Sequence, residues 1–268
     1  MKIIRFFTEN LFTDAVCTSK STPVAGYPLA NLLHDWYTKA TRSSEDDDTW
    51  WMWDLGSAQH VDGILFKGHN FRVGATVKIQ ANFTDDDINW GYPNNEPDWE
   101  DVITITADLL TKELIYNTTV PASHCWWIRL SVLDDAGGGN PDGYLKLGKP
   151  WAGAYFEPSK NFINAYIIRI NDLSRVETSA EGYHFGTKVS PKLRGFEYVF
   201  ENLTNEDKLA FIEMFEEVGV TQTFFVLQDA DSLPEGLFYV RNMNATWEFR
   251  HVFMDDNFSF TISVMESK

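Results

Sequence analysis

The sequence predicts a mainly β fold, with an antiparallel β-sandwich over residues 1–157 and a smaller α+β domain over residues 158–268. Many short segments carry apolar residues at alternate positions and are separated by turn residues, as in antiparallel sheets. Only one segment has the spacing of an amphipathic helix. The chain also contains 10 Trp and 20 Phe among its 268 residues, and large rings suit a sandwich core.

The first domain is built on an aromatic strand in which Trp51, Trp53 and Leu55 share one face, so these side chains are expected to point inward. Gly56 is expected to end this strand. Further strands are expected at residues 61–68, 75–81, 102–105, 114–116, 126–132 and 144–147. Residues 84–100 read as a long acidic and aromatic loop, and unstructured loops of that length are often functional.

The second domain contains the expected helix, which begins after Thr204 and ends before Gly219. Thr204 is a good N-cap and Asp207 stands three residues later, as in a capping box. The expected apolar stripe consists of Leu209, Ile212 and Phe215, with Phe211 and Val218 further round. Strands are expected at residues 165–170, 193–200, 223–227, 236–240, 245–249 and 258–264. This order predicts one helix on one face of an antiparallel sheet.

The composition is strongly acidic, with a formal net charge of −17. Such a surface repels phosphate backbones, which argues against nucleic-acid binding. It fits solubility, affinity for divalent cations or docking to a basic partner. No apolar stretch is long enough to span a membrane, and no secretory signal is expected.

The sequence indicates no catalytic site. The six histidines lack the HxxxH or HExxH spacing, and the glycines at 137–139 lack the lysine of a phosphate loop. We therefore expect a binding or assembly protein and not an enzyme. Cys17 and Cys125 are expected to be reduced thiols in or near the core.

Two groups of residues are candidates for binding. Trp90, Tyr92 and Trp99 in the long loop could contact a ligand or partner, although they could equally fold back over the sandwich edge. The second group is an acidic run. Asp46, Asp47 and Asp48 could hold a structural Ca²⁺, as could residues 85–87, although charge runs are usually solvated.

The first domain resembles discoidin (coagulation factor V/VIII C-type) domains. Trp51-Met52-Trp53-Asp54-Leu55-Gly56 matches their W-x-x-D-L-G strand in full. Ala30-Asn31-Leu32 resembles their opening segment, residues 61–67 resemble the next strand, and residues 126–130 resemble a late strand. The resemblance covers about residues 10–155 and implies a β-sandwich, often with a structural calcium ion.

The second domain resembles part of certain tailed-bacteriophage virion proteins, among them distal-tail ring proteins. Those proteins carry the pattern F-x-F-x-x-L-T/S-x-x-E before a helix. Phe200, Leu203 and Thr204 match it, whereas Tyr198 replaces the first Phe and Asp207 replaces the Glu. The resemblance implies a tail-tip or baseplate component that forms a homo-oligomeric ring, contacts other tail proteins and assembles in the host cytoplasm into the virion.

Two functional hypotheses follow for the whole chain. The main one is a structural, ring-forming component of a phage tail tip. The alternative is a carbohydrate-binding protein for adsorption to host surface glycans, with Trp90, Tyr92 and Trp99 as its platform.

Overall fold

The chain forms two compact units in a computed structural model, and each is described by itself. The structure describes residues 4–34, 38–82, 99–106, 113–116, 125–135, 138–163, 167–172, 174–187, 192–229, 236–252 and 257–267. One unit comprises Glu9–Tyr155, and the other comprises Met1–Thr8 together with Phe156–Lys268. No helix in the described ranges is long and apolar enough to cross a membrane.

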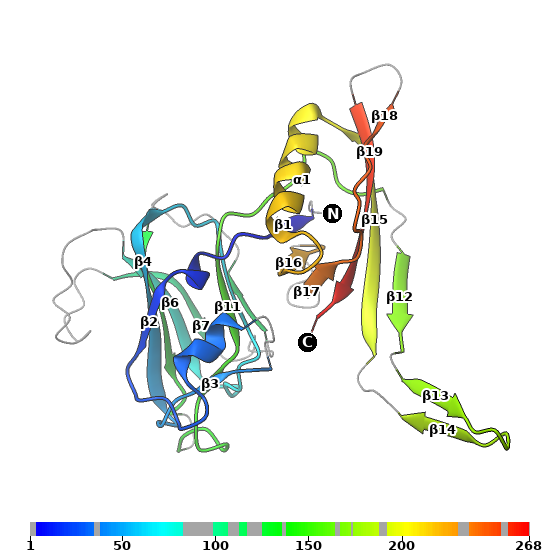
Figure 1. The fold of residues 1–268 in the computed structure, drawn as a ribbon. Helices are drawn as coiled ribbons and strands as arrows, with labels where there is room; N and C mark the ends of the chain where they lie inside the picture. The colour runs from blue at the N-terminus through cyan, green and yellow to red at the C-terminus, as the bar shows by residue number, and fades with distance from the viewer. Residues whose placement is uncertain are drawn as a thin grey trace. The chain divides into compact units, whose positions relative to one another are not determined.

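The first unit is an antiparallel β-sandwich (Figure 1). One sheet has the order β2 (Val16–Ser19), β4 (Asp48–Gln59), β9 (Cys125–Leu133), β6 (Thr76–Asn82) and β7 (Glu100–Thr106). The other has the order β11 (Lys149–Gly153), β5 (Gly63–Lys67) and β8 (Glu113–Tyr116). A short ladder joins β3 (Thr41–Arg42) to β10 (Lys146–Leu147), and two 3₁₀ turns lie at Leu11–Thr13 and Leu29–Leu33.

The two sheets share one core, because their inward residues belong to a single apolar cluster. Trp53 is fully buried, with its ring 4.4 Å from that of Phe12 and 5.8 Å from that of Phe66 in the facing sheet. Trp51 is buried as well, which confirms the predicted inward face. Gly56 does not end the strand as expected, because β4 continues through a register shift to Gln59.

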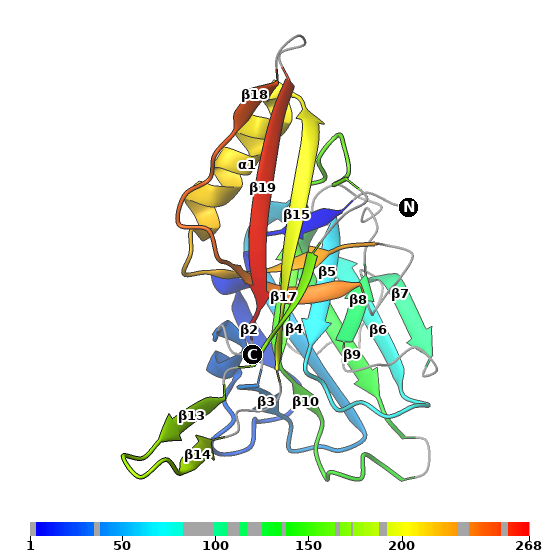
Figure 2. The ribbon, with the colours of Figure 1, turned by 90° about the vertical axis from the view of Figure 1, so that its right-hand side faces the viewer.

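The second unit contains a seven-stranded antiparallel sheet within the described residues. Its order is β1 (Arg5–Phe7), β16 (Thr223–Leu227), β17 (Leu237–Asn242), β19 (Asn257–Glu266), β15 (Leu193–Leu203) and β12 (Ile167–Asn171), with β18 (Arg250–Val252) also paired to β19. The long strands β15 and β19 run side by side, and α1 (Asn205–Val218) covers one face of the sheet (Figure 2). A separate hairpin joins β13 (Arg175–Thr178) to β14 (His184–Thr187).

The chain start differs from the expected division at residue 157. The first eight residues belong with the second unit, because β1 pairs with β16. Phe6 also exchanges backbone hydrogen bonds with Phe156, at 2.9 and 2.8 Å. This first strand is short, so its pairing partner far along the chain could not be inferred from local periodicity.

The helix α1 has the predicted capping box. The Thr204 hydroxyl accepts from the Asp207 N–H at 3.1 Å, and the Asp207 carboxylate accepts from the Thr204 N–H at 2.9 Å. The buried face is formed by Phe211, Met214 and Val218, so the two residues expected further round the helix are buried. Ile212 and Phe215 of the expected stripe are only half-buried. Leu209 is 49% exposed because it points away from the sheet.

The segment at residues 245–249 is not a strand, contrary to expectation. The Asn242 side chain accepts from the Asn244 N–H and donates to the Asn244 carbonyl, which turns the chain out of β17. Trp247 and Phe249 still pack against Phe260, which explains the alternating pattern. The hairpin β13–β14 was not expected from the polar sequence of this stretch.

The predicted fold class is confirmed. The protein is mainly β, with an antiparallel sandwich in one unit and an α+β arrangement in the other. In the described residues the second unit has one α-helix, and it packs on an antiparallel sheet.

Candidate functional site

The strands β3 and β10, labelled in Figure 2, form a short ladder in which two cationic residues are direct partners. Arg42 pairs with Lys146, and Thr41 pairs with Leu147. Thr41 and Leu147 are fully buried, whereas Arg42 and Lys146 are only half-buried. Since opposite residues of a ladder point to the same side, both cations lie on the outer face.

The Arg42 guanidinium is held between two tyrosine rings. Its central carbon lies 3.6 Å from the ring centroid of Tyr27 and 4.3 Å from that of Tyr144, which are cation–π distances. The Arg42 Nε is buried and has no hydrogen-bond partner among the residues that the structure describes. We call Tyr27, Arg42, Tyr144 and Lys146 the β3–β10 site.

Backbone contacts hold the first tyrosine in place. The Tyr27 carbonyl accepts from the Thr41 hydroxyl at 3.0 Å and from the Arg42 N–H at 3.4 Å. The Val24 N–H donates to the Arg42 carbonyl at 2.9 Å. Hydrogen bonds therefore join the loop that carries Tyr27 to strand β3.

Asn70 holds the second tyrosine. Its Nδ2 donates to the Tyr144 carbonyl at 3.0 Å and to the Asp142 carboxylate at 2.9 Å. Its Oδ1 accepts from the Lys146 N–H at 2.7 Å. One amide side chain thus sets the path of the segment from Asp142 to Lys146.

The buried carboxylate of Asp134 holds the same loop through hydrogen bonds. Asp134 is fully buried and accepts from Arg72 Nε at 2.7 Å, from the Arg72 N–H at 3.2 Å and from Asn140 Nδ2 at 2.9 Å. Asn140 in turn donates to the Asn70 carbonyl at 2.9 Å. This network is continuous with Asn70 and so supports the β3–β10 site.

The structure describes only one of the three aromatic residues predicted to bind a ligand. Trp90 and Tyr92 lie outside the described residues. Trp99 is half-buried, and its ring lies 4.5 Å from the guanidinium carbon of Arg129 on β9. Trp99 therefore stacks on the sandwich itself, and a ligand role for this loop stays a prediction.

Arg129 belongs to a polar row on the same sheet. It donates to Gln80 at 2.8 Å, and Gln80 donates to Asp101 at 2.7 Å. Desolvation acts to raise the pKa of Asp101, but the hydrogen bonds from Lys78 and Gln80 outweigh it and leave that pKa below its usual value. The polar side chains of this row therefore hydrogen-bond to one another, in contrast to the Nε of Arg42.

The acidic run at residues 46–48 is not gathered into a metal centre. No group of three or more His, Cys, Asp or Glu side chains could hold a metal ion in the described ranges. Asp48 instead forms an ion pair with Lys20, and Asp46 lies against Gly139, where a Cβ would come within 2.6 Å of its Oδ2. Asp47 contributes a backbone carbonyl, which accepts from the Asp134 N–H at 2.5 Å. A structural Ca²⁺ on these aspartates therefore stays a prediction, and residues 85–87 lie outside the described chain.

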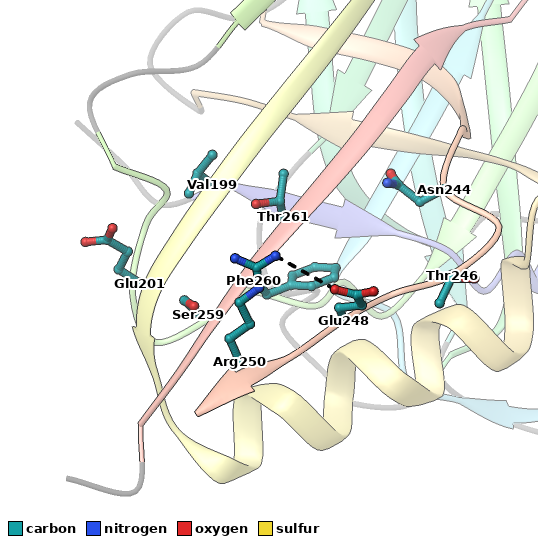
Figure 3. Close-up of a pocket in the computed structure, with 9 residues that line it drawn as sticks. All are labelled: Val199, Glu201, Asn244, Thr246, Glu248, Arg250, Ser259, Phe260 and Thr261. Carbon is teal, nitrogen blue, oxygen red and sulfur yellow. Dashed lines mark ion pairs between the residues drawn. The ribbon is translucent and has the colours of Figure 1, made fainter. Parts of the chain in front are cut away.

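The second unit has a polar hollow of about 470 Å³ on the sheet face that points away from α1 (Figure 3). It is lined by Val199, Glu201, Asn244, Thr246, Glu248, Arg250, Ser259, Phe260 and Thr261. Its cation is already compensated, because Arg250 lies 3.9 Å from Glu248. Phe260 is only 2% exposed, so the ring offers little surface for stacking.

The two cysteines are free thiols. Burial raises the pKa of Cys17 to about 12, and burial likewise raises the pKa of Cys125 to about 12. Both are therefore protonated at neutral pH, which disfavours a role as thiolate nucleophiles.

Comparison with known proteins gives similarity in structure alone. No family model matches the chain, and no curated protein matches it. A chitosan-binding module of a chitosanase/glucanase from Paenibacillus sp. IK-5 is 22% identical with a TM-score of 0.41, covering 55% of this chain and 99% of the module.

Two further structures are similar at lower identity. A fucose-binding module of Streptococcus pneumoniae is 14% identical with a TM-score of 0.39, covering 55% of this chain and 99% of the module. A Ruminococcus gnavus GH29 fucosidase is 12% identical with a TM-score of 0.43, covering 56% of this chain and 27% of the enzyme. At TM-scores this low the similarity does not assign a ligand to this chain.

Sequence reasoning missed all four members of the β3–β10 site. The available signal was the placement of Arg42 and Lys146 at outward positions of short strands within a chain of 22 basic and 39 acidic residues. The pairing of residues so distant in sequence is needed to see that the two cations meet.

Proposed function

We propose that this protein is a non-catalytic carbohydrate-binding protein and that the β3–β10 site contacts the sugar. The observation that carries the proposal is the Arg42 guanidinium, which is held between the rings of Tyr27 and Tyr144 and lies opposite Lys146 on the ladder. Because Arg42, Tyr27 and Tyr144 are each half-buried, part of this aromatic and cationic surface stays accessible to a ligand.

A sugar fits the chemistry of this site. Its hydroxyl oxygens can accept from Arg42 and Lys146, and its apolar C–H face can pack on the exposed parts of the tyrosine rings. Hydrogen bonds to the backbone carbonyls of Tyr27 and Tyr144 hold the segments that carry the rings, so little backbone freedom is lost on binding. The site thus combines aromatic surface on well-held segments with two cationic donors.

Replacing a tyrosine of the site is expected to weaken glycan binding by about ten-fold or more. Tyr144→Ala and Tyr27→Ala each remove a ring that both orients Arg42 and contacts the sugar, on the scale of about 1.4 kcal/mol or more for an anchoring side chain. A glycan array selects the ligand, and isothermal titration calorimetry measures the affinity of each variant.

Tyr183→Ala is the matched control, because Tyr183 is 65% exposed in the β13–β14 turn and belongs to the other unit. The proposal is wrong if no glycan binds, or if both site variants bind as well as the unchanged protein. Trp90→Ala tests the alternative loop platform. If binding requires Trp90 and not the tyrosines, the ligand belongs to the loop at residues 84–100.

A second candidate function, assembly, is favoured by the edge strand β12. Ile167, Ile168 and Ile170 are 48%, 52% and 71% exposed, and within the described ranges β12 pairs with β15 on one side only. Edge strands are usually protected by charge or proline, and an apolar open edge is a template for another strand. In its finer form, the predicted ring-forming tail-tip component of a phage virion, this role stays a prediction.

The edge is suited to pairing with a second copy of the chain. An antiparallel pair centred on Arg169 places Ile168 of each copy opposite Ile170 of the other. Arg169 would meet its own copy, but its charge is compensated by Glu197 at 2.6 Å. The pairing therefore buries isoleucines without leaving a cation unpaired.

The double variant Ile168→Lys/Ile170→Lys is expected to abolish self-association, because like charges would face each other across the strand pair. Sedimentation velocity over a concentration series measures the oligomeric state. Val73→Lys is the control, since Val73 is 70% exposed in the sandwich unit. A strictly monomeric parent protein, or unchanged association of the double variant, contradicts an assembly role for β12.

A further inference from the structure

The sign of the charges on the β3–β10 site narrows the ligand class. Arg42 and Lys146 are cross-strand neighbours with the same charge. Like charges directly opposite each other destabilise a β ladder, so such a pair is normally relieved by a nearby carboxylate. Within the part of the chain that the structure describes, neither cation forms an ion pair, although the protein has 39 acidic residues.

The carboxylate closest to Lys146 along the chain is engaged elsewhere. Asp142 accepts from Asn70 Nδ2 at 2.9 Å and is exposed. Other cations of the first unit do have carboxylate partners: Lys20 pairs with Asp48, and Arg72 pairs with Asp134 at 2.7 Å. Among the described residues, Arg42 and Lys146 therefore lack the carboxylate partner that these two cations have.

Arg42 is also presented in the form that recognises a carboxylate. The rings of Tyr27 and Tyr144 hold the guanidinium, and its Nε is buried, so the terminal N–H groups of this half-buried side chain are the donors left for a ligand. A fixed guanidinium offers parallel N–H donors that match the two oxygens of a carboxylate. Lys146 adds a mobile second cation on the same face.

On the basis of the proposed function, we propose that the sugar bound at this site is acidic and that its carboxylate lies between Arg42 and Lys146. The net charge of −17 opposes an anion at long range. At physiological salt, however, charges beyond about 8 Å are largely screened, so the two local cations decide the preference.

The test compares an oligogalacturonide with its methyl ester, which keeps the same sugar backbone and removes the negative charge. The unchanged protein is expected to bind the acid about ten-fold tighter than the ester, the factor typical of a charge-assisted hydrogen bond. Lys146→Gln and Arg42→Gln are expected to remove this preference. Lys160→Gln, which removes an exposed cation from the other unit, is expected to leave it unchanged.

Each outcome decides a different claim. Equal affinity for acid and ester overturns the acidic ligand, yet leaves the proposed function standing if Tyr144→Ala still abolishes binding of both. Failure of both saccharides and of every glycan on an array overturns the proposed function as well. Binding of inorganic phosphate that depends on Lys146, with no saccharide bound, identifies a general anion site and also overturns the acidic sugar.

Discussion

Phe211→Ala is expected to destabilise the second unit by about 3–5 kcal/mol, the range for truncating a large buried ring. Phe211 is fully buried on α1, and its ring lies 4.8 Å from both Phe156 and Phe260 and 5.3 Å from Phe200. It also contacts Phe6 on the first strand at 5.7 Å. The substitution leaves a cavity where the helix, the sheet and the N-terminal strand meet.

Denaturant unfolding followed by near-ultraviolet circular dichroism measures this loss, since aromatic packing gives the signal. Leu209→Ala is the control on the same helix, because Leu209 is 49% exposed and alanine is a good helix former. A loss below about 1 kcal/mol for Phe211→Ala would show that the helix does not depend on this cluster.

The capping box of this helix could be predicted from the sequence more reliably than its buried face. The capping box of Thr204 and Asp207 was predictable, because its partners are three residues apart and its chemistry is local. The buried face was predicted less well, since several apolar residues surround the helix and only packing selects among them. Asp207 is an example of a buried polar residue on this helix. It is 5% exposed, and it also accepts from the Ser159 N–H at 2.8 Å, a contact that only the fold brings about.

The sandwich core followed from period-two alternation. Trp51 and Trp53 point inward as expected, because a strand buried on one face must place alternate residues there. The pairing order of the strands carries no comparable local signal. For that reason the division of the chain at its first residues, and the hairpin β13–β14, were not predicted.

The candidate site required the fold for the same reason. Tyr27, Arg42 and Lys146 come from three segments that meet only when β3 pairs with β10. Sequence alone directed attention to aromatic residues in the long loop, yet Trp99 stacks on Arg129. The composition shows which residue types are frequent in the chain. A donor without an acceptor, such as the Arg42 Nε, can be recognised only in the folded structure, where its neighbours are known.

The hydrogen-bond network that supports this site can be tested by replacing its buried carboxylate, Asp134. Asp134→Asn is expected to destabilise the sandwich by about 3–5 kcal/mol, the scale of breaking a buried ion pair. Oδ1 of Asp134 accepts from Arg72 Nε, and Oδ2 accepts from the Arg72 N–H and from Asn140 Nδ2. Whichever way the new amide turns, its NH₂ group meets donors, so at least one hydrogen bond is replaced by a repulsive contact.

The consequence should extend to binding, because Asn140 links Asp134 to Asn70, and Asn70 holds Tyr144. Hydrogen exchange should show lost protection in the backbone of residues 138–147, and calorimetry should show weaker glycan binding at a temperature where the variant is still folded. Asp135→Asn, at the exposed neighbouring position, is expected to change stability by less than about 0.5 kcal/mol. If Asp134→Asn matches that control in both stability and exchange, the carboxylate does not hold the loop, and the β3–β10 site must be organised by Asn70 and the strand pairing alone.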